Sequence, residues 1–329
     1  MENNKWLKLY NLINEWNQLQ PWTELWSEDY ISIEFSQEET YYCSIMGKLG
    51  NCIGLSIYQG DEGYADLCSI AKEYDDMAIM RYMMYDQNCL TFYMGDRDEV
   101  PPQQKKIIKE LGLKYRGKGK WPYFVSFQKR FYPYHLNDDE LHVFIKVLER
   151  LIDIMQNYSQ QKIDVDYEKE EMIYAYKKDD QWQYIAHVRK DDINKMMPVE
   201  LTNQQYLEKL IQQPQKQNQL IIDLSYLSQG MYDKGHSRPI NPLVFLVIDL
   251  ESQMLLTMNL LKTEEDEILC CIQFLCQYIE IHGRPDAVFI RNPIIYCAIA
   301  DICEKCDIEL YQTKLDMIDN ILDDLENTI

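Results

Sequence analysis

Acidic side chains in the last quarter of the chain have the types and spacing that can hold divalent metal ions. Asp249 ends the apolar run LVFLVIDL, and Glu251 follows two residues later, on the same side if the strand continues. Near the C-terminus, Asp316, Asp319 and Asp323 fall on one face of an expected helix. Phosphodiester chemistry uses two metal ions ~3.5–4 Å apart between converging carboxylates, and Mg²⁺ or Mn²⁺ takes oxygen ligands. One interpretation is therefore a metal site built on Asp249 and Glu251.

The same acids also have a purely structural interpretation. Asp favours turns, so Asp249 with the residues that follow it can make a hairpin turn. The acidic side of the last helix is what a solvated face looks like opposite an apolar one. Under this interpretation the chain needs no cofactor, and Mg²⁺ or Mn²⁺ enters only with an enzymatic function.

A second candidate site is a basic island in an acidic chain. Residues 101–130 carry nine Lys or Arg and one acid, so the segment is +8 while the whole chain is −21. In RGKGKWPYF, glycines let backbone N–H groups approach an anion, cations supply charge and an aromatic ring can stack on a base. The candidate binding residues are Lys114, Arg116, Lys118, Lys120 and Trp121.

The partner of this island is not identified by the sequence. The acidic remainder of the chain opposes non-specific wrapping of nucleic acid, because phosphate repels it. A local contact between residues 105–120 and nucleic acid or another anionic partner is compatible with this charge distribution. The alternative is that these lysines face an acidic surface of the same protein.

The ten cysteines fit reduced thiols in a cytoplasmic protein. Cys303 and Cys306 form a CxxC, but they follow one apolar helical face, which favours small core residues over zinc ligands. No apolar run approaches the ~20 residues of a membrane helix, so no membrane association is expected. The five histidines have no helix-spaced or strand-spaced partner that indicates catalysis.

Hydrophobic periodicity predicts two domains. An apolar stripe predicts a helix over residues 3–19, and strand-like runs on both sides of GKLGN predict a hairpin. These elements, with a helix ending near 158, predict an α+β domain over 1–158. The polar stretch 159–171 is the expected linker. Residues 172–329 are expected to form the second domain, with a hairpin at 172–188, a strand at 220–227 and a C-terminal block that alternates strands and helices.

Two pieces of the chain carry family resemblances. YYCSIMGKLG and LGLKYRGKGKWPYFVSFQKRFYP resemble an uncharacterised N-terminal domain of bacterial proteins, and PLVFLVIDLESQMLLTMNL with GRPDAVFIRNPIIYCAIADICEKCDIEL resembles an uncharacterised C-terminal domain joined to it. The C-terminal block also resembles the ribonuclease H-like α/β fold with a mixed sheet. That resemblance implies a metal-binding Asp on the first strand and a second acid after a later strand, where this chain has Asn292. Only two strands follow Pro242, so the strand with Asp223 is a candidate for the missing third, which would remove Asp249 from the first strand.

The leading hypothesis is therefore a cytoplasmic protein that binds an anionic partner and is not an enzyme. The rival is a divalent-metal-dependent nuclease or phosphodiesterase that uses Asp249, Asn292 and Asp319. A third hypothesis, a protein–protein interaction module, rests on the 25 tyrosines of the chain.

Overall fold

The computed structural model describes residues 2–190 and 195–327, which fall into two compact units. The first unit comprises Met1–Ala71, Gln87–Lys129 and Pro133–Ile193, and the second comprises Lys72–Asp86, Arg130–Tyr132 and Asn194–Ile329. The chain therefore crosses between the units several times, and each unit has its own hydrophobic core. No described helix has the length and apolar character needed to cross a bilayer.

The first unit is built on an eight-stranded mixed sheet with the order β6-β5-β4-β3-β2-β1-β7-β8. Its strands are β1 (Ile31–Ser36), β2 (Glu39–Met46), β3 (Gly54–Gln59), β4 (Cys89–Gly95), β5 (Trp121–Gln128), β6 (Phe131–Tyr134), β7 (Glu171–Lys178) and β8 (Gln181–Val188). Its helices are α1 (Glu2–Leu19), α2 (Gly60–Ile70), α4 (Pro102–Glu110) and α5 (Asp138–Ser159), with short 3-10 turns at Pro21–Thr23 and Tyr167–Lys169.

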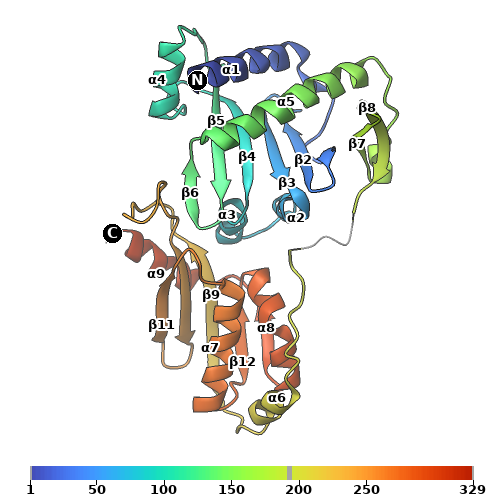
Figure 1. The fold of residues 1–329 in the computed structure, drawn as a ribbon. Coiled ribbons are helices and arrows are strands. Elements are labelled where there is room, and N and C mark those ends of the chain that lie inside the picture. Colours follow the sequence, from blue (N-terminus) through green and yellow to red (C-terminus); the bar gives the residue numbers. More distant parts are fainter. Residues whose placement is uncertain (1, 191–194, 328–329) are drawn as a thin grey trace. The chain divides into compact units, whose positions relative to one another are not determined.

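Helices α1 and α5 cover one face of this sheet, and α2 packs on the other (Figure 1). The predicted stripe of α1 is buried, with Trp6 and Trp16 at 2% and 0% exposure. A capping box between Asn137 and Glu140 fixes the start of α5. The predicted hairpin around GKLGN is confirmed, because β2 and β3 pair antiparallel with Met46 opposite Gly54.

The predicted domain boundary is wrong. Strand β7 pairs in parallel with β1, with Ile173 opposite Ile31, and β8 continues the same sheet. The hairpin at 171–188 therefore belongs to the first unit, so residues 159–171 are a connection within that unit and do not link the two. Burial explains the pairing, since Met172, Ile173 and Ala175 are at most 1% exposed and belong to the hydrophobic cores on the two faces of the first sheet.

The second unit contains a five-stranded mixed sheet with the order β11-β10-β9-β12-β13. Its strands are β9 (Gln219–Tyr226), β10 (Leu243–Asp249), β11 (Met254–Leu261), β12 (Ala287–Ile290) and β13 (Glu309–Gln312). Its helices are α3 (Met77–Tyr85), α6 (Gln204–Ile211), α7 (Glu267–His282), α8 (Pro293–Lys305) and α9 (Asp316–Glu326).

Both faces of this second sheet are covered, which explains why its central strands read as continuous apolar runs. Helices α3, α6, α7 and α8 share one core with Leu220, Ile222 and Leu224 of β9. Helix α9 packs on the opposite face, where Ile318 and Leu322 meet the alternate residues of β9 and β10. Cys303 and Cys306 are 1% and 0% exposed, so their predicted place in the core is confirmed, and burial raises the pKa of Cys303 to about 12.

Candidate functional site

Arg291, just after β12, joins this strand to its neighbour β9 in the interior of the second sheet. Strands β9 and β12 run parallel, with Phe289 opposite Ile221, so Arg291 emerges level with Asp223. The guanidinium makes two bonds to the Asp223 carboxylate, Nε to Oδ1 at 3.1 Å and Nη2 to Oδ2 at 2.8 Å. It also donates to the Ser225 hydroxyl at 3.0 Å and to Asp319 Oδ1 of α9 at 2.5 Å. We call these four residues the buried ionic cluster.

The cluster is almost completely removed from water. Asp223 and Arg291 are 1% and 2% exposed, and only the Asp319 side chain, at 51%, reaches solvent. Burial disfavours the charged guanidinium, but the carboxylates of Asp223 and Asp319 more than offset this and hold the pKa of Arg291 above its usual value. Bidentate Arg–carboxylate pairing is among the strongest hydrogen-bonding geometries in proteins. The cluster is therefore a fixed structural contact in which both carboxylates already have a cation.

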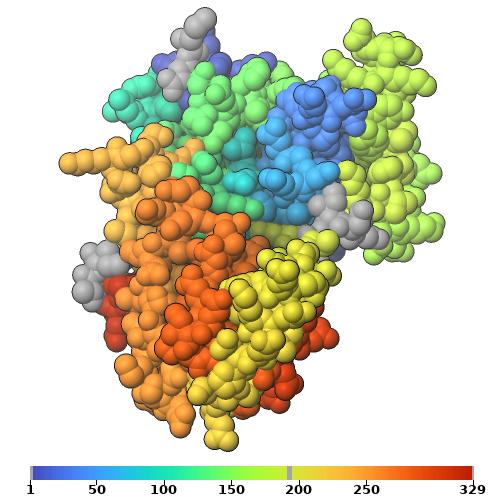
Figure 2. All heavy atoms as spheres, turned by 60° about the horizontal axis from the view of Figure 1, so that its bottom comes forward, coloured from blue at the N-terminus to red at the C-terminus, as the bar shows by residue number. Residues whose placement is uncertain are grey.

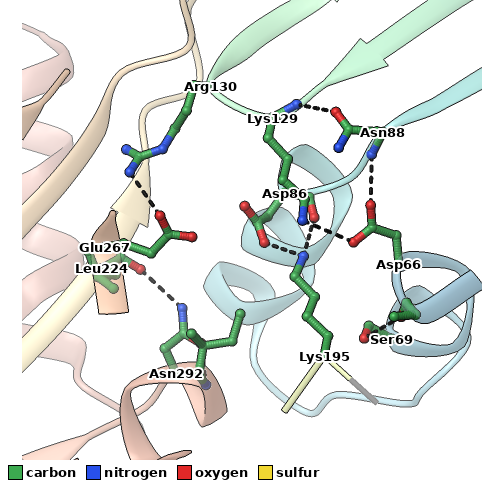
Figure 3. Close-up of polar contacts among 12 residues, drawn as sticks. Asp66, Ser69, Asp86, Asn88, Lys129, Arg130, Lys195, Leu224, Glu267 and Asn292 are labelled. Carbon is green, nitrogen blue, oxygen red and sulfur yellow. Dashed lines mark hydrogen bonds and ion pairs between the residues drawn. The ribbon is translucent and has the colours of Figure 1, made fainter. Parts of the chain in front are cut away.

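Asn292, the expected counterpart of a second acid, is a helix cap. Its side-chain oxygen accepts from the backbone N–H of Ile294 at 3.0 Å at the start of α8, and Pro293 occupies the first helical position. Its amide nitrogen points to the Leu224 carbonyl of β9 at 3.5 Å (Figure 3). Since Asn292 is 1% exposed and both ends of its amide are engaged, it is positioned to start α8 and not to hold a metal ion.

We expect Asn292→Ala to lower the free energy of unfolding of the second unit by about 0.5–2 kcal/mol, because the first turn of α8 loses its cap. Urea unfolding followed by far-UV circular dichroism measures this change. Asn292→Ser keeps a capping oxygen and should recover most of the loss. An equal loss in both variants would contradict the capping role.

Asp249 and Glu251, the predicted metal ligands, lie away from the buried ionic cluster. Asp249 pairs in register with Leu220, near the start of β9 and three residues before Asp223, roughly 10 Å along the strand. Its carboxylate accepts from the Ser252 backbone N–H at 2.8 Å and from the Ser252 hydroxyl at 2.7 Å, and these bonds lower the pKa of Asp249. The turn interpretation therefore fits this residue. Among described residues, no group of three or more His, Cys, Asp or Glu can hold a metal ion.

Of the predicted catalytic set, the structure brings Asp319 to the cluster, with Asn292 beside it, and leaves Asp249 out. The residues missed as partners are Asp223 and Arg291. A signal for them exists in the sequence: both are charged residues embedded in apolar strand segments, LIIDLSYL and AVFIRNP. Charges rarely occupy such positions unless they are paired. Their opposite signs could have indicated that the two strands are neighbours.

A cavity of about 300 Å³ opens beside the cluster, lined in part by Ser225 and Asp319. Five aspartates line it, together with Arg81 and Lys314 as cations. Excess negative charge repels a phosphate backbone when no metal ion neutralises it. This end of the second sheet is thus electrostatically unsuited to nucleic acid.

The basic segment of the first unit divides into paired and unpaired cations. Lys129, near its end, forms an ion pair with the buried Asp66 at 3.3 Å, and Asp66 also accepts from the Asn88 backbone at 2.9 Å (Figure 3). In the second unit, Arg130 is 5% exposed and pairs with Glu267 at 3.0 Å. For Lys129 and Arg130, the expectation that basic residues face acids of the same protein holds.

Three of the remaining cations lie on α4, and four lie on the connection between α4 and β5, residues 111–120, which we call the basic loop. Four of its side chains are exposed and form no ion pair with any carboxylate of the described residues: Lys114, Arg116, Lys118 and Lys120. Gly117 and Gly119 adopt φ values of 98° and 63°, which glycine tolerates without strain. The basic loop thus presents its charge to solvent.

Three contacts hold the basic loop in place. Gln104 of α4, fully buried, exchanges two hydrogen bonds with the backbone of Phe124 in β5, at 2.6 and 2.9 Å. The Gly119 N–H donates to Asp96 at 2.7 Å. Trp121 is half-buried, with the Tyr115 ring at 5.9 Å and the Arg97 guanidinium over its face at 5.9 Å. Trp121 therefore stabilises the base of the loop, and base stacking would require it to leave these partners.

Comparisons with known proteins find matches to two separate regions of the chain. Residues 206–326 match a family model described as domain of unknown function DUF6930, within the second unit. Residues 6–175 match one described as domain of unknown function DUF7309, which covers the first sheet up to β7. A search of curated proteins finds no match. Since the second of these models spans more than half of the 329 residues, the chain belongs to the DUF7309 family and carries a DUF6930 domain after it.

Proposed function

We propose that this protein acts by binding an anionic partner through the basic loop of its first unit. The observation that carries the proposal is the set of four exposed cations without carboxylate partners in a chain of net charge −21. Such a chain has many acids to pair with, and Lys129 and Arg130 do pair with them. A group of unpaired cations on a loop whose backbone is anchored is a suitable contact for phosphate or carboxylate groups.

The proposed contact reads charge and not base identity. Trp121 is engaged with Arg97 and Tyr115, and no aromatic residue of the segment 111–124 is among the large exposed apolar side chains. Three of the four loop cations are lysines, which act as point charges, whereas specific reading of bases needs bidentate or stacking geometry. The partner we favour is therefore a nucleic-acid backbone bound without sequence preference.

We further propose that the second unit is a ribonuclease H-like scaffold without metal-dependent catalysis. Its order of three antiparallel strands, then two parallel strands after helices, supports this assignment. On this assignment β9 is the first strand, and Asp223 stands where the resemblance expects a metal-binding acid. The guanidinium of Arg291 then takes the place of the cation between Asp223 and Asp319.

The test of the binding function is charge reversal of the basic loop. A fluorescent 20-nucleotide single strand of mixed sequence should bind the full chain with a log–log salt slope of about −3, since four cations neutralise phosphates. Changing all four loop cations to Glu should abolish this binding. A matched variant reverses four exposed lysines outside the loop: Lys72, Lys162, Lys178 and Lys234. It carries the same change in net charge and should bind within about threefold of the wild type.

Equal losses in both variants would refute a role for the basic loop, because net charge alone would then explain binding. Binding of poly-glutamate but not of nucleic acid would assign the loop to an acidic protein partner. The rival enzyme predicts cleavage of the strand with Mg²⁺ or Mn²⁺ that Asp249→Asn removes. Under our proposal Asp249→Asn leaves both folding and binding unchanged, because Asp249 only closes a turn.

A further inference from the structure

The edge strand of the second sheet lacks the features that usually protect such edges. β11 is the last strand of its sheet, and within residues 2–190 and 195–327 its outer edge pairs with no other strand. Its sequence, MLLTMNLL, has no charge and no proline. Proteins normally block an open edge with Lys, Pro, a short strand or a cover. Here eight residues offer an unblocked backbone ladder.

The side chains of β11 are apolar and exposed as well. Five of them stand between 40% and 62% exposed: Met254, Leu255, Leu256, Met258 and Leu260. Scattered exposed apolar residues are ordinary, but a contiguous strand of them is typical of an interaction surface. The free backbone groups and the exposed apolar side chains of β11 together favour addition of a strand from a partner. Such a strand hydrogen-bonds to the free backbone groups and covers the apolar side chains.

A groove runs along this edge beside α7. It has a volume of about 610 Å³, and β11 contributes Thr257 to Leu261 to its lining while α7 contributes Gln273, Phe274 and Gln277. The segment that contains β11 and α7 is orange in Figure 2. Phe245 of β10 also contributes to its lining. An added strand places every second side chain on the same face. The groove gives those side chains a site beside the helix.

Charge at the two ends of β11 decides what can occupy the edge. Asp249 and Glu251 precede the strand, and Glu264 and Glu265 follow it, beside Lys262 and the Arg130 guanidinium, which donates to the Glu265 carbonyl. A second copy paired antiparallel would set the Asp249–Glu251 end against the Glu264–Glu265 end, and a parallel copy would set like ends together. Like charges placed opposite each other destabilise a pair of strands. The residues of the second unit carry 25 Asp or Glu against 13 Lys or Arg, which adds long-range repulsion between copies.

We propose that β11 and the groove beside α7 bind an extended apolar segment of a partner protein that carries basic residues at both ends. The segment adds to the sheet as a sixth strand. Its backbone completes the ladder of β11, its apolar side chains cover those of β11, and its flanking cations pair with the acids at the two ends. This surface is on the second unit and is independent of the basic loop.

The probe is a synthetic capped peptide of alternating valine and threonine with two lysines at each end. Titrated into the full chain, it should bind measurably by fluorescence anisotropy. The same peptide with glutamates at its ends should bind at least tenfold more weakly, and a version methylated on alternate backbone nitrogens should not bind. These two comparisons separate charge at the ends from hydrogen bonding along the strand.

The matching protein variant is Leu256→Lys with Met258→Lys, which places charge on β11 at positions already 40% and 41% exposed. It should weaken peptide binding at least tenfold. Its control is Ile281→Lys with Tyr296→Lys, on α7 and α8, at 74% and 43% exposure, which adds the same charge away from the edge and should stay within twofold. Equal effects in the two variants, or no binding of the lysine-flanked peptide, would overturn the proposal.

Sedimentation of the full chain separates this partner from a second copy. The wild type should sediment as a species that the Leu256→Lys, Met258→Lys variant does not change. A wild-type dimer that becomes a monomer in this variant would show that another copy of the chain occupies the edge, and the proposal would be wrong. An unchanged species supports the basic partner segment.

Discussion

Arg291→Ala should lower the free energy of unfolding of the second unit by about 3–5 kcal/mol, because it leaves the Asp223 carboxylate buried without a cation. Arg291 also holds Asp319 of α9, so the contact between this helix and β9 weakens with it. Urea unfolding, followed by a probe in the second unit, measures the change. A loss below 1 kcal/mol would mean that the buried ionic cluster does not form in solution.

Two variants test whether the loss of stability comes from the Asp223 carboxylate that is left buried without a cation. Asp319→Asn removes the carboxylate that is half exposed, and it should cost at most about 1 kcal/mol, since exposed ion pairs contribute little. The double variant Asp223→Leu, Arg291→Met replaces the pair by apolar side chains and should recover at least half of the loss seen in Arg291→Ala. A double variant as unstable as Arg291→Ala would assign the loss to packing and not to charge.

Arg291→Ala also tests the proposal that the second unit is a ribonuclease H-like scaffold. Removing the guanidinium leaves Asp223 and Asp319 facing one site without their cation, and oxygen ligands of this kind suit Mn²⁺. We expect Mn²⁺ to raise the melting temperature of Arg291→Ala and to leave that of the wild type unchanged, because a ligand stabilises only the state that binds it. An equal response of both proteins would count against Arg291 as a substitute for a metal ion.

Phe124→Ala should destabilise the first unit by about 3–5 kcal/mol. The ring is fully buried at the centre of the first core, with the rings of Trp6, Tyr10, Phe92 and Phe144 at centroid distances of 5.3–5.8 Å. Truncation removes these aromatic contacts and leaves a cavity that the sheet cannot close. Thermal unfolding with tryptophan fluorescence measures the loss.

Trp26→Ala provides the control for this change. Trp26 is 48% exposed, so its truncation should shift stability by less than about 1 kcal/mol. Since the two units have separate cores, Phe124→Ala should lower the unfolding transition of the first unit, and Arg291→Ala that of the second. A single transition that both variants shift equally would show that the units unfold together.

Local patterns in the sequence predicted elements that depend on neighbouring residues. The helical stripe of α1, the hairpin of β2 and β3, and the helical face that carries Cys303 and Cys306 follow from period and turn residues alone. The turn at Asp249 was one of two interpretations of that residue. The charge of residues 101–130, +8, was also evident, but the sequence left open whether its cations face solvent or acids of the same protein.

The sequence did not predict which strands pair with each other or which charged side chains form ion pairs. Strand β7 follows a polar stretch typical of a linker, yet it joins β1 some 140 positions away in the chain. Asp223, Arg291 and Asp319 come from β9, the end of β12 and α9, and nothing near any of them in sequence specifies the other two. The sequence also left open which strand adjoins β12, and the structure shows that this strand is β9 and not β10.

By itself, the sequence determined where most helices and strands form and where unbalanced charge accumulates, because periodicity, propensity and composition act over a few residues. Only the tertiary structure decided that Arg291 sits between two carboxylates and that β11 is left at an open edge. Both depend on strand order and register, which are set by the burial of whole faces of a sheet against helices distant in the chain.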